Sequence, residues 1–487
     1  MSTFRRLLIA ATALGLSIPG LLISAPTQAA AVGCSAGNKV AGDLNSDGMA
    51  DIVVGVPSYA NDRGAVDVAF SNGVRLFVTT NVLGLPGAVG DRFGESVAVA
   101  DIDGDGCDDL AIGAPGRASG KGAVYLAKAS GTSTLSGWHI FDGTAANGSF
   151  GAQVVLLEPT RQLVVSAPTA DDGAAWEAGQ VQVLRLSSVG AQVGSRVILT
   201  QNSPGVPGAS ESGDRFGTAL AGQGRTIVIG TPSEAIGSRT QAGSVTLLSA
   251  SAAAPVGYRG VTVHQDVSGV PGTAESDDMF GAAVAVKDNH VLVGVPGETI
   301  GSDYATGMVH LLHFDPVGRK ATSLRSISQD TAGIPGSNED GDYFGSAVAL
   351  GINTLDQLTA AVGAPGEAIG NVLGAGMVTL FRANRTGGAT ATFRQGTGGV
   401  YGTPEAADHF GASLGIIGGD LNDGEAMTEG LVIGAPGENV GSTVDAGMVT
   451  FTRDGFTSYA LLLEDTPSGM NVPAHAQYGE VGTQVAS

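Results

Sequence analysis

Basic residues are scarce in this chain of 487 residues. It contains 24 Lys and Arg against 46 Asp and Glu, which gives a formal net charge of -22. Proteins that bind nucleic acid need clustered Lys and Arg to neutralise phosphates. The composition therefore argues against nucleic acid as a partner and favours cations or basic surfaces.

Cysteine is nearly absent as well, since only Cys34 and Cys107 occur. An even number of cysteines in an exported chain favours a disulfide. We therefore predict a Cys34–Cys107 bridge. Two unrelated buried thiols are the alternative.

Long apolar stretches are missing after the N-terminal segment. In that segment two Arg residues precede the apolar stretch Leu7–Ile23, and small residues follow from Ala25. The pattern predicts a secretory signal peptide over residues 1–30, and hence a secreted or cell-envelope protein. No later stretch reaches the roughly 18 apolar residues of a membrane-spanning helix, so we expect no membrane span in residues 31–487.

Glycine, in contrast, is abundant, with 77 residues, and much of it belongs to a repeat. Short apolar runs end in a Gly-Ala-Pro-like tripeptide, and a Phe-Gly pair precedes all but the first of them. The seven tripeptides begin at Gly55, Gly113, Ser166, Gly230, Gly294, Gly363 and Gly434, and the six pairs at Phe93, Phe150, Phe216, Phe280, Phe344 and Phe410. A repeat of this length is typical of an array, propeller or solenoid.

One repeat contains four segments that favour strands, namely Phe280–Val286, His290–Pro296, Met308–Phe314 and Ser323–Ser328. The first two flank a tight turn and form a hairpin. Four antiparallel strands make one propeller blade, and we expect the Phe ring to fill the space between blades. We therefore predict an all-β fold for residues 31–487, a seven-bladed β-propeller of four-stranded antiparallel blades.

The first blade lacks a Phe-Gly pair in front of it. A similar pair, Tyr478-Gly479, stands near the C-terminus instead. A ring with an open seam would expose sheet edges, which proteins usually avoid. We predict that residues 478–487 supply the missing strand of the first blade and close the ring.

In two blades the turn between the first two strands becomes an acidic loop, Asp43–Asp51 and Asp101–Asp109. Side-chain oxygens at loop positions one, three, five and nine, with a backbone carbonyl at position seven, can surround one hard cation. An all-oxygen shell suits Ca²⁺ better than Zn²⁺ or copper. The predicted metal ligands are Asp43, Asn45, Asp47, the carbonyl of Met49, Asp51, Asp101, Asp103, Asp105, the carbonyl of Cys107 and Asp109. The alternative is a pair of acidic turns without a metal.

A third loop, Asp420–Glu425, occupies the equivalent place in the last blade. It is degenerate, because Gly430 stands where the final Asp is expected. Whether this loop binds calcium stays open.

Further acidic residues recur beside the repeat motifs. We expect an Asp two residues before each Phe to cap the turn into the strand, because Asp commonly has that role. These residues are Asp91, Asp214, Asp278, Asp342 and Asp408. We expect Glu298, Glu367 and Glu438, which follow tripeptides, to face solvent.

The segment Gly411–Gly415 matches the pattern of a hydrolase nucleophile elbow around Ser413. That motif requires a turn from a strand into a helix. Here the serine lies inside the predicted first strand of a blade, so we interpret the match as accidental.

Together, the Phe-Gly pairs, the acidic nonapeptides and the Gly-Ala-Pro tripeptides resemble FG-GAP repeats, the units of the seven-bladed propeller of integrin alpha subunits. The resemblance extends from about Gly42 to the end of the chain. It implies that the acidic loops bind Ca²⁺ on one propeller face, and that loops on the other face recognise ligands. The integrin loops lie in later blades, and integrin signalling is not implied.

Two functional hypotheses from different classes follow. The first is an exported, calcium-binding propeller that acts as an extracellular binding or adhesion module for a macromolecule or glycan, with Trp176 and Tyr304 as contact residues. Local packing is the alternative role for both aromatic residues. The second is a secreted hydrolase or lyase with carboxylates near the propeller axis, and a purely structural envelope protein is a third possibility.

Overall fold

The structure is a computed structural model. It describes residues 34, 40–192, 194, 196–249, 257–352, 357–385, 389–397, 400–417, 430–439, 445, 447–453, 457–461 and 480–481. All of them belong to the second of two units of the chain, Ala31–Ser487. The predicted signal peptide lies outside the described residues and stays a prediction. In the described part, no helix is long and apolar enough to cross a membrane.

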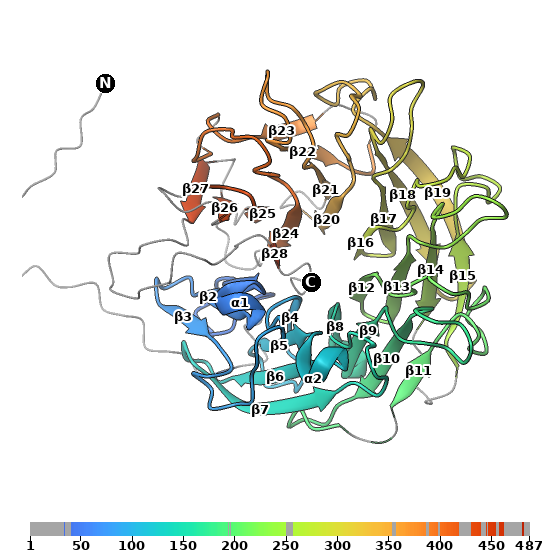
Figure 1. Ribbon diagram of the computed structural model, residues 1–487. Coiled ribbons are helices and arrows are strands. Elements are labelled where there is room, and N and C mark those ends of the chain that lie inside the picture. Colours follow the sequence, from blue (N-terminus) through green and yellow to red (C-terminus); the bar gives the residue numbers. More distant parts are fainter. Residues whose placement is uncertain are drawn as a thin grey trace, which may run out of the picture. The chain divides into compact units, whose positions relative to one another are not determined.

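Seven four-stranded antiparallel sheets are arranged around a central axis (Figure 1). Blade 1 consists of β28 (Glu480–Val481), β1 (Ile52–Val56), β2 (Ala65–Ala69) and β3 (Arg75–Val78). Blade 2 consists of β4 (Val97–Ala100), β5 (Asp109–Ala114), β6 (Ala123–Ala129) and β7 (Leu135–Asp142). Blade 3 consists of β8 (Val154–Leu157), β9 (Gln162–Ala167), β10 (Gln180–Arg185) and β11 (Val197–Leu199).

The remaining four blades follow the same inner-to-outer order. Blade 4 consists of β12 (Ala219–Gln223), β13 (Thr226–Thr231), β14 (Ser244–Ser249) and β15 (Arg259–Val263). Blade 5 consists of β16 (Ala283–Lys287), β17 (His290–Val295), β18 (Met308–Asp315) and β19 (Lys320–Ile327). Blade 6 consists of β20 (Ala347–Ile352), β21 (Leu358–Ala364), β22 (Met377–Arg382) and β23 (Ala389–Phe393). Blade 7 consists of β24 (Ser413–Ile417), β25 (Gly430–Ala435), β26 (Met448–Arg453) and β27 (Thr457–Leu461).

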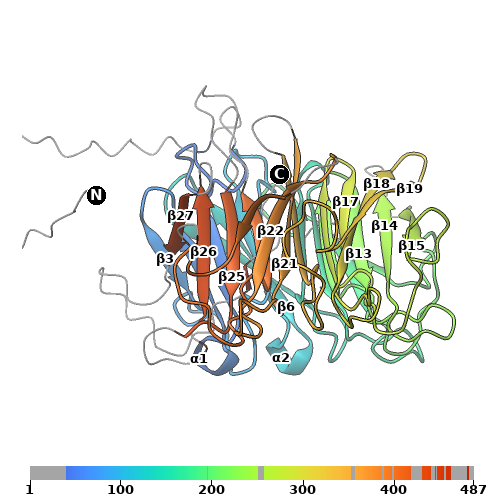
Figure 2. The ribbon, with the colours of Figure 1, turned by 90° about the horizontal axis from the view of Figure 1, so that it is seen from above.

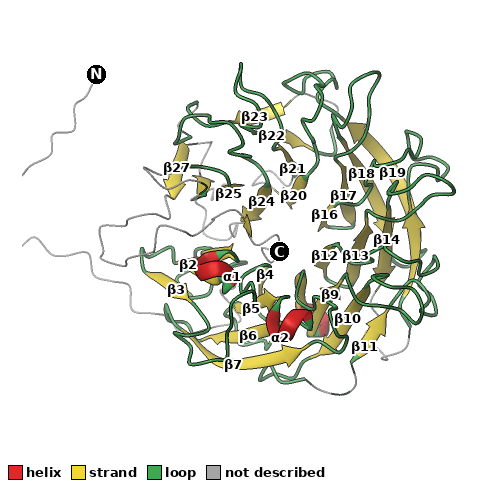
Figure 3. Cartoon of the chain, in the orientation of Figure 1, coloured by secondary structure: helices red, strands yellow, loops and turns green. Residues whose placement is uncertain are grey.

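Helices contribute little to the described chain (Figure 3). The short turns α1 (Tyr59–Asp62) and α2 (Arg117–Gly120) each contain three residues with positive φ, so neither is a regular right-handed helix. One 3₁₀ turn covers Glu158–Thr160. The predicted all-β propeller of seven four-stranded blades is confirmed.

The two repeat motifs meet through their backbones. In blade 5 the N–H of Gly281 donates to the carbonyl oxygen of Gly294 over 2.9 Å. A Cβ on Gly294 would overlap the carbonyl oxygen of Gly345, which belongs to the Phe-Gly pair of blade 6. Only glycine at position 294 therefore lets the two blades approach this closely.

The Phe rings lie between blades, as the sequence predicted. All six are fully buried. Phe280, for example, belongs to one apolar cluster with Val245 and Val263 of blade 4 and Val293 of blade 5. Each blade is thus packed against the next by an aromatic ring.

The C-terminal strand closes the ring. In β28, Val481 pairs with Val54 and Glu480 with Gly55 of β1, in antiparallel register. β28 also contacts β24 and β25 of blade 7. The predicted closure is therefore confirmed, while Tyr478 and Gly479 themselves lie outside the described residues.

Removal of residues 478–487 should lower the melting temperature sharply, because β1 would lose its inner neighbour and expose an edge. A chain that ends at Val481 is the control, since it keeps both described pairs with β1. Circular dichroism melts of the two truncated chains and the parent measure the effect. Equal melting temperatures for the parent and the chain that ends at residue 477 would contradict the role of β28.

Candidate functional site

The first acidic loop is folded around the carboxylate of Asp43. Its Oδ1 accepts hydrogen bonds from the N–H groups of Asn45 (3.1 Å) and Asp47 (3.3 Å), and its Oδ2 accepts one from Gly48 (2.9 Å). The N–H of Asp47 also donates to Asn45 Oδ1 over 3.0 Å, and the N–H of Met49 donates to Asp47 Oδ1 over 3.1 Å. Asp43 and Asn45 are buried, whereas Asp47 is exposed.

The second acidic loop repeats this pattern. The N–H of Asp105 donates to Oδ1 of Asp101 and of Asp103, over 3.1 Å in both cases. The N–H of Gly106 donates to Asp101 Oδ2 over 3.1 Å, and the N–H of Cys107 donates to Asp105 Oδ1 over 2.9 Å. Loop positions one, three, five, six and seven therefore have equivalent contacts in both loops.

The last carboxylate of each loop comes from the start of the following strand. Asp51 Oδ1 accepts the N–H of Ser71 over 2.8 Å, and Asp109 Oδ1 accepts the N–H of Ala129 over 3.2 Å. Both carboxyl groups are buried. Burial is the main cause that raises the pKa of Asp51 to about 7 and that of Asp109 to about 8, and neighbouring loop carboxylates add to both shifts.

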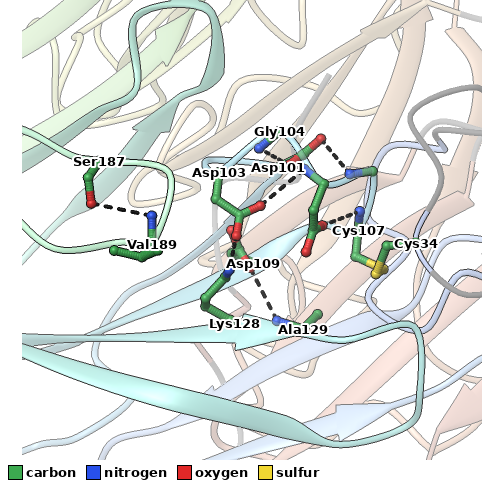
Figure 4. A network of polar contacts seen from close by, with 12 residues as sticks. Cys34, Asp101, Asp103, Gly104, Cys107, Asp109, Lys128, Ala129, Ser187 and Val189 are labelled. Atoms are coloured by element: carbon green, nitrogen blue, oxygen red, sulfur yellow. Dashed lines mark hydrogen bonds and ion pairs between the residues drawn. A yellow bond between two sulfur atoms is a disulfide. The ribbon is translucent and has the colours of Figure 1, made fainter.

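Three buried carboxylates converge in the second loop (Figure 4). Oxygens of Asp101, Asp103 and Asp109 all lie within 4.8 Å of one another. Asp109 Oδ2 has no hydrogen-bond partner among the described residues. Like charges this close repel, so the arrangement favours a bound cation, and a donor set made only of oxygens fits a hard divalent ion.

The two cysteines are joined by a disulfide, so the predicted Cys34–Cys107 bridge is confirmed. It ties the segment before the first blade to the second loop. Because the sulfur of Cys107 is bonded to Cys34, it offers no thiolate to a metal.

The two acidic loops also contact each other. The N–H of Gly42 donates to Asp108 Oδ2 over 2.5 Å, and the N–H of Asp108 donates to the carbonyl oxygen of Asp43 over 3.1 Å. The structure therefore brings the predicted ligands of both loops to one side of the ring. The degenerate loop at Asp420 lies outside the described residues.

The opposite end of the blades carries a second set of repeated loops. Because strand direction alternates, loops after the second strands lie opposite the acidic loops, on the side where Figure 2 shows α1 and α2. We call residues 168–179, 232–243, 296–307 and 365–376 the tip loops. Within each tip loop, an isolated antiparallel β-bridge joins two residues that are three positions apart, for example Ile300 and Asp303.

The tip loops present large side chains to solvent at one equivalent position. Trp176 is 59% exposed, Tyr304 56% and Leu373 73%. The carbonyl oxygens of these residues accept hydrogen bonds from the next blade, from the N–H groups of Gly213 (2.9 Å), Gly341 (3.0 Å) and Ala407 (3.0 Å). The backbone beneath each exposed side chain is therefore fixed. More than half of the Trp176 and Tyr304 side chains is thus open to solvent.

Gln–Glu contacts link blades 3 to 7 beside the loops that follow the second strands. In four blade pairs a Gln at the end of one outer strand donates from Nε2 to the Glu Oε2 of the next blade. The pairs are Gln201–Glu234, Gln265–Glu298, Gln329–Glu367 and Gln395–Glu438. The expectation that Glu298 and Glu438 face solvent is wrong, because the amide of the preceding blade holds each carboxyl group between blades.

The Asp residues before the Phe-Gly pairs cap their turns, as predicted. Each accepts a hydrogen bond from the N–H three residues earlier, for example Asp278 Oδ2 from Glu275 over 2.6 Å. The same contact recurs at Asp91, Asp214, Asp342 and Asp408.

A pocket of about 590 Å³ lies among the innermost strands of blades 2 to 7. Its acidic lining residues are Glu158 and Asp288, accompanied by Arg225 and Lys287, and its described lining includes no His, Cys or Ser. Ser413 is part of β24 and pairs with Gly434, so it does not stand on a nucleophile elbow. The match around Ser413 is therefore accidental, as interpreted from the sequence, while Glu158 and Asp288 are the carboxylates that line this pocket near the axis.

Comparison with known proteins supports the repeat assignment. The FG-GAP repeat model matches residues 40–68 and 93–126, which contain both acidic loops. Integrin alpha-PS2 of Drosophila melanogaster is 36% identical over 131 residues, which cover 25% of this chain and 9% of the integrin. Phosphatidylinositol-glycan-specific phospholipase D of Mus musculus is 37% identical over 97 residues, which cover 17% of this chain and 12% of that protein.

Among solved structures, a protein of unknown function from Desulfotomaculum acetoxidans has a TM-score of 0.44 and 12% sequence identity, with 90% of this chain and 99% of the other covered. The chain thus spans about a tenth of the length of the curated relatives that it matches. The FG-GAP repeats, the integrin alpha relatives and the seven blades together support an integrin-like propeller.

The interblade carboxyl groups predict a pH dependence of stability. Glu298 has a pKa of about 7, and burial is the main cause of this rise. The hydrogen bond from Gln265 lowers the pKa, whereas the nearby charges of Asp278 and Glu275 raise it further. A carboxyl group whose pKa is raised by folding stabilises the protein fully below its unfolded pKa, and this stability is lost as pH rises. In EDTA, the melting temperature should therefore fall as pH rises from about 4.5 through 7.

Glu298→Gln should make this fall less steep, because the variant cannot titrate at that site. The exposed Asp62→Asn serves as the control. Melts at pH 5, 6, 7 and 8 measure the slopes. A slope in Glu298→Gln as steep as in the parent would show that this carboxyl group does not contribute.

Proposed function

We propose that this FG-GAP propeller is an exported binding module, held rigid by calcium and used to bind an extracellular macromolecule or glycan through its tip loops. The observation that carries the proposal is the set of exposed side chains Trp176, Tyr304 and Leu373 at one position of three tip loops. Rigid aromatic side chains supply large contact areas at a small entropic cost. Their fixed backbone reduces the cost of binding further.

Calcium has a structural role in this proposal. The ligands are Asp43, Asn45, Asp47, the carbonyl of Met49 and Asp51 in the first loop, and Asp101, Asp103, Asp105, the carbonyl of Cys107 and Asp109 in the second. The buried carboxylates and the matching hydrogen bonds of the two loops support it. Affinities of extracellular calcium modules lie at about 10⁻⁴ to 10⁻³ M.

A location outside the cytoplasm agrees with both proposed roles. The disulfide is of a kind that persists in oxidising surroundings, and the N-terminal segment has the pattern of a signal peptide over residues 1–30. Millimolar calcium outside cells would fill sites of this affinity. We therefore place the mature protein outside the cytoplasm.

Calcium should raise the melting temperature and EDTA should lower it. A cation present at ten times Kd stabilises the folded state by about 1.4 kcal/mol per site. Asp51→Asn and Asp109→Asn should each remove part of the difference between calcium and EDTA, and exposed Asp62→Asn should remove none. A parent protein that melts identically in calcium and in EDTA would rule out the stabilising role.

Trp176→Ala and Tyr304→Ala should each reduce binding to ligands found on an array of extracellular proteins and glycans by about tenfold, since buried aromatic contacts often contribute more than 1 kcal/mol. Melting temperatures should stay unchanged, because both side chains are exposed. Val317→Ala is the matched control, because Val317 is 90% exposed in the β18–β19 turn, away from the tip loops. Unchanged binding by both aromatic variants would show that the ligand binds elsewhere on the protein.

A further inference from the structure

The two acidic loops share a pattern of internal hydrogen bonds, and two of their differences change the charge around the predicted metal ligands. Loop position three is Asn45 in the first loop and Asp103 in the second. The second difference lies at the end of the third strand of each blade. It concerns the residue just before the one whose N–H donates to the last carboxylate of the loop. Because Ser71 and Ala129 make this equivalent contact, the residues before them correspond, and they are Phe70 and Lys128.

The two differences compensate each other in charge. Among the predicted metal ligands, the first loop has three carboxylates and no Lys at this position, whereas the second has four carboxylates and Lys128. Each of these sets has a formal charge of -3. Asp108, the fifth carboxylate of the second loop, is not a predicted ligand and accepts the N–H of Gly42. In blade 1, Phe70 is buried in the apolar core, so that blade has no cation at the corresponding place.

Lys128 lies directly against the second loop. Its Nζ forms an ion pair with Asp103 Oδ2, and the two side chains are 27% and 2% exposed (Figure 4). Asp103 also accepts the N–H of Asp105 through its other oxygen, so the carboxylate is held from both sides. The partial exposure of Lys128 gives the ammonium group a route to solvent.

We propose that Lys128 is a tethered counter-ion that sets the affinity of the second loop for divalent cations. This inference rests on the calcium role proposed above. Without calcium, the ammonium group offsets one of four crowded carboxylates. A calcium ion that binds Asp103 must compete with Lys128 for its oxygen and must also tolerate a positive charge close by. Lys128 therefore stabilises the empty loop and weakens calcium binding to it.

Removal of Lys128 should therefore change calcium affinity and the stability of the calcium-free protein in opposite directions. This combination distinguishes a counter-ion from a residue that only packs. Lys128→Met should bind calcium more tightly at the second loop, by a factor on the order of ten. The same variant should melt at a lower temperature in EDTA, because four carboxylates are left without their counter-ion. Loss of a residue that only packs would lower stability without raising affinity.

The first loop supplies the design of a compensating variant. Asp103→Asn alone should weaken calcium binding, since it removes a ligand charge and leaves Lys128 in place. Adding Lys128→Phe gives the second loop the residues of the first at both positions. The double variant should recover affinity relative to Asp103→Asn.

Arg161 provides a control for general charge effects. Its Nη2 would lie 3.1 Å from a Cβ on Gly104, so the guanidinium group is close to the second loop. Lys128 is ion-paired with Asp103, whereas Arg161 approaches the loop at Gly104. Arg161→Met removes one positive charge from the same neighbourhood and should change calcium affinity less than Lys128→Met.

Calorimetric titration of the full mature chain with calcium chloride tests the proposal, in an Asp51→Asn background that isolates the second loop. EDTA melts of each variant show whether it is folded. Tighter binding by Lys128→Met with recovery in the double variant supports the proposal. Equal affinity of the parent and Lys128→Met overturns it but leaves the calcium role intact, whereas a parent that binds no calcium overturns both.

Discussion

The close backbone approach between neighbouring blades is the constraint on which the rest of the structure depends. Gly294 of blade 5 can lie against the carbonyl of Gly345 of blade 6 only because it has no side chain. The Phe ring beside each such glycine then fills the space between the two sheets. The same approach recurs at Gly113, Gly230 and Gly363, whereas blade 3 has Ser166 at the equivalent position. Where it occurs, the contact fixes neighbouring inner strands, and the alternation of strand direction separates the acidic loops from the tip loops.

Much of this could be predicted from the sequence, because the informative signals are local. The spacing from Phe280 to Pro296 defines a hairpin, and the alternating oxygens from Asp101 to Asp109 define a loop whose internal hydrogen bonds join residues at most five apart. The burial of Glu298 could not be predicted in the same way. Its partner Gln265 lies on another blade, so neither residue shows by itself that the carboxyl group is covered. Lys128 was missed because its partner lies across the sheet, 25 residues away.

The seam of the ring depends on contacts that the other blades do not need. β28 contributes only two described pairs to β1, compared with five or six between the inner strands of blades 4, 5 and 6. The nearby chain compensates in three ways: the disulfide from Cys34 to Cys107, the hydrogen bonds between Asp108 and the first loop, and the two acidic loops themselves. Blades 3 to 7 are joined in turn by the four Gln–Glu contacts.

The short pairing of β28 with β1 gives a reason why crowded carboxylates occur near the seam. In the proposed calcium-bound state, an ion that links several backbone segments beside the short strand pairing would add its binding free energy to the stability of the closed ring. Each acidic loop must also keep its shape before the ion arrives. In the first loop the polar but uncharged Asn45 limits the repulsion, and in the second the Lys128 ammonium group offsets the charge of Asp103. Counted over the proposed metal ligands and Lys128, the two loops thus reach the same net charge with different side-chain pairs, as a limit on electrostatic repulsion between ligands requires.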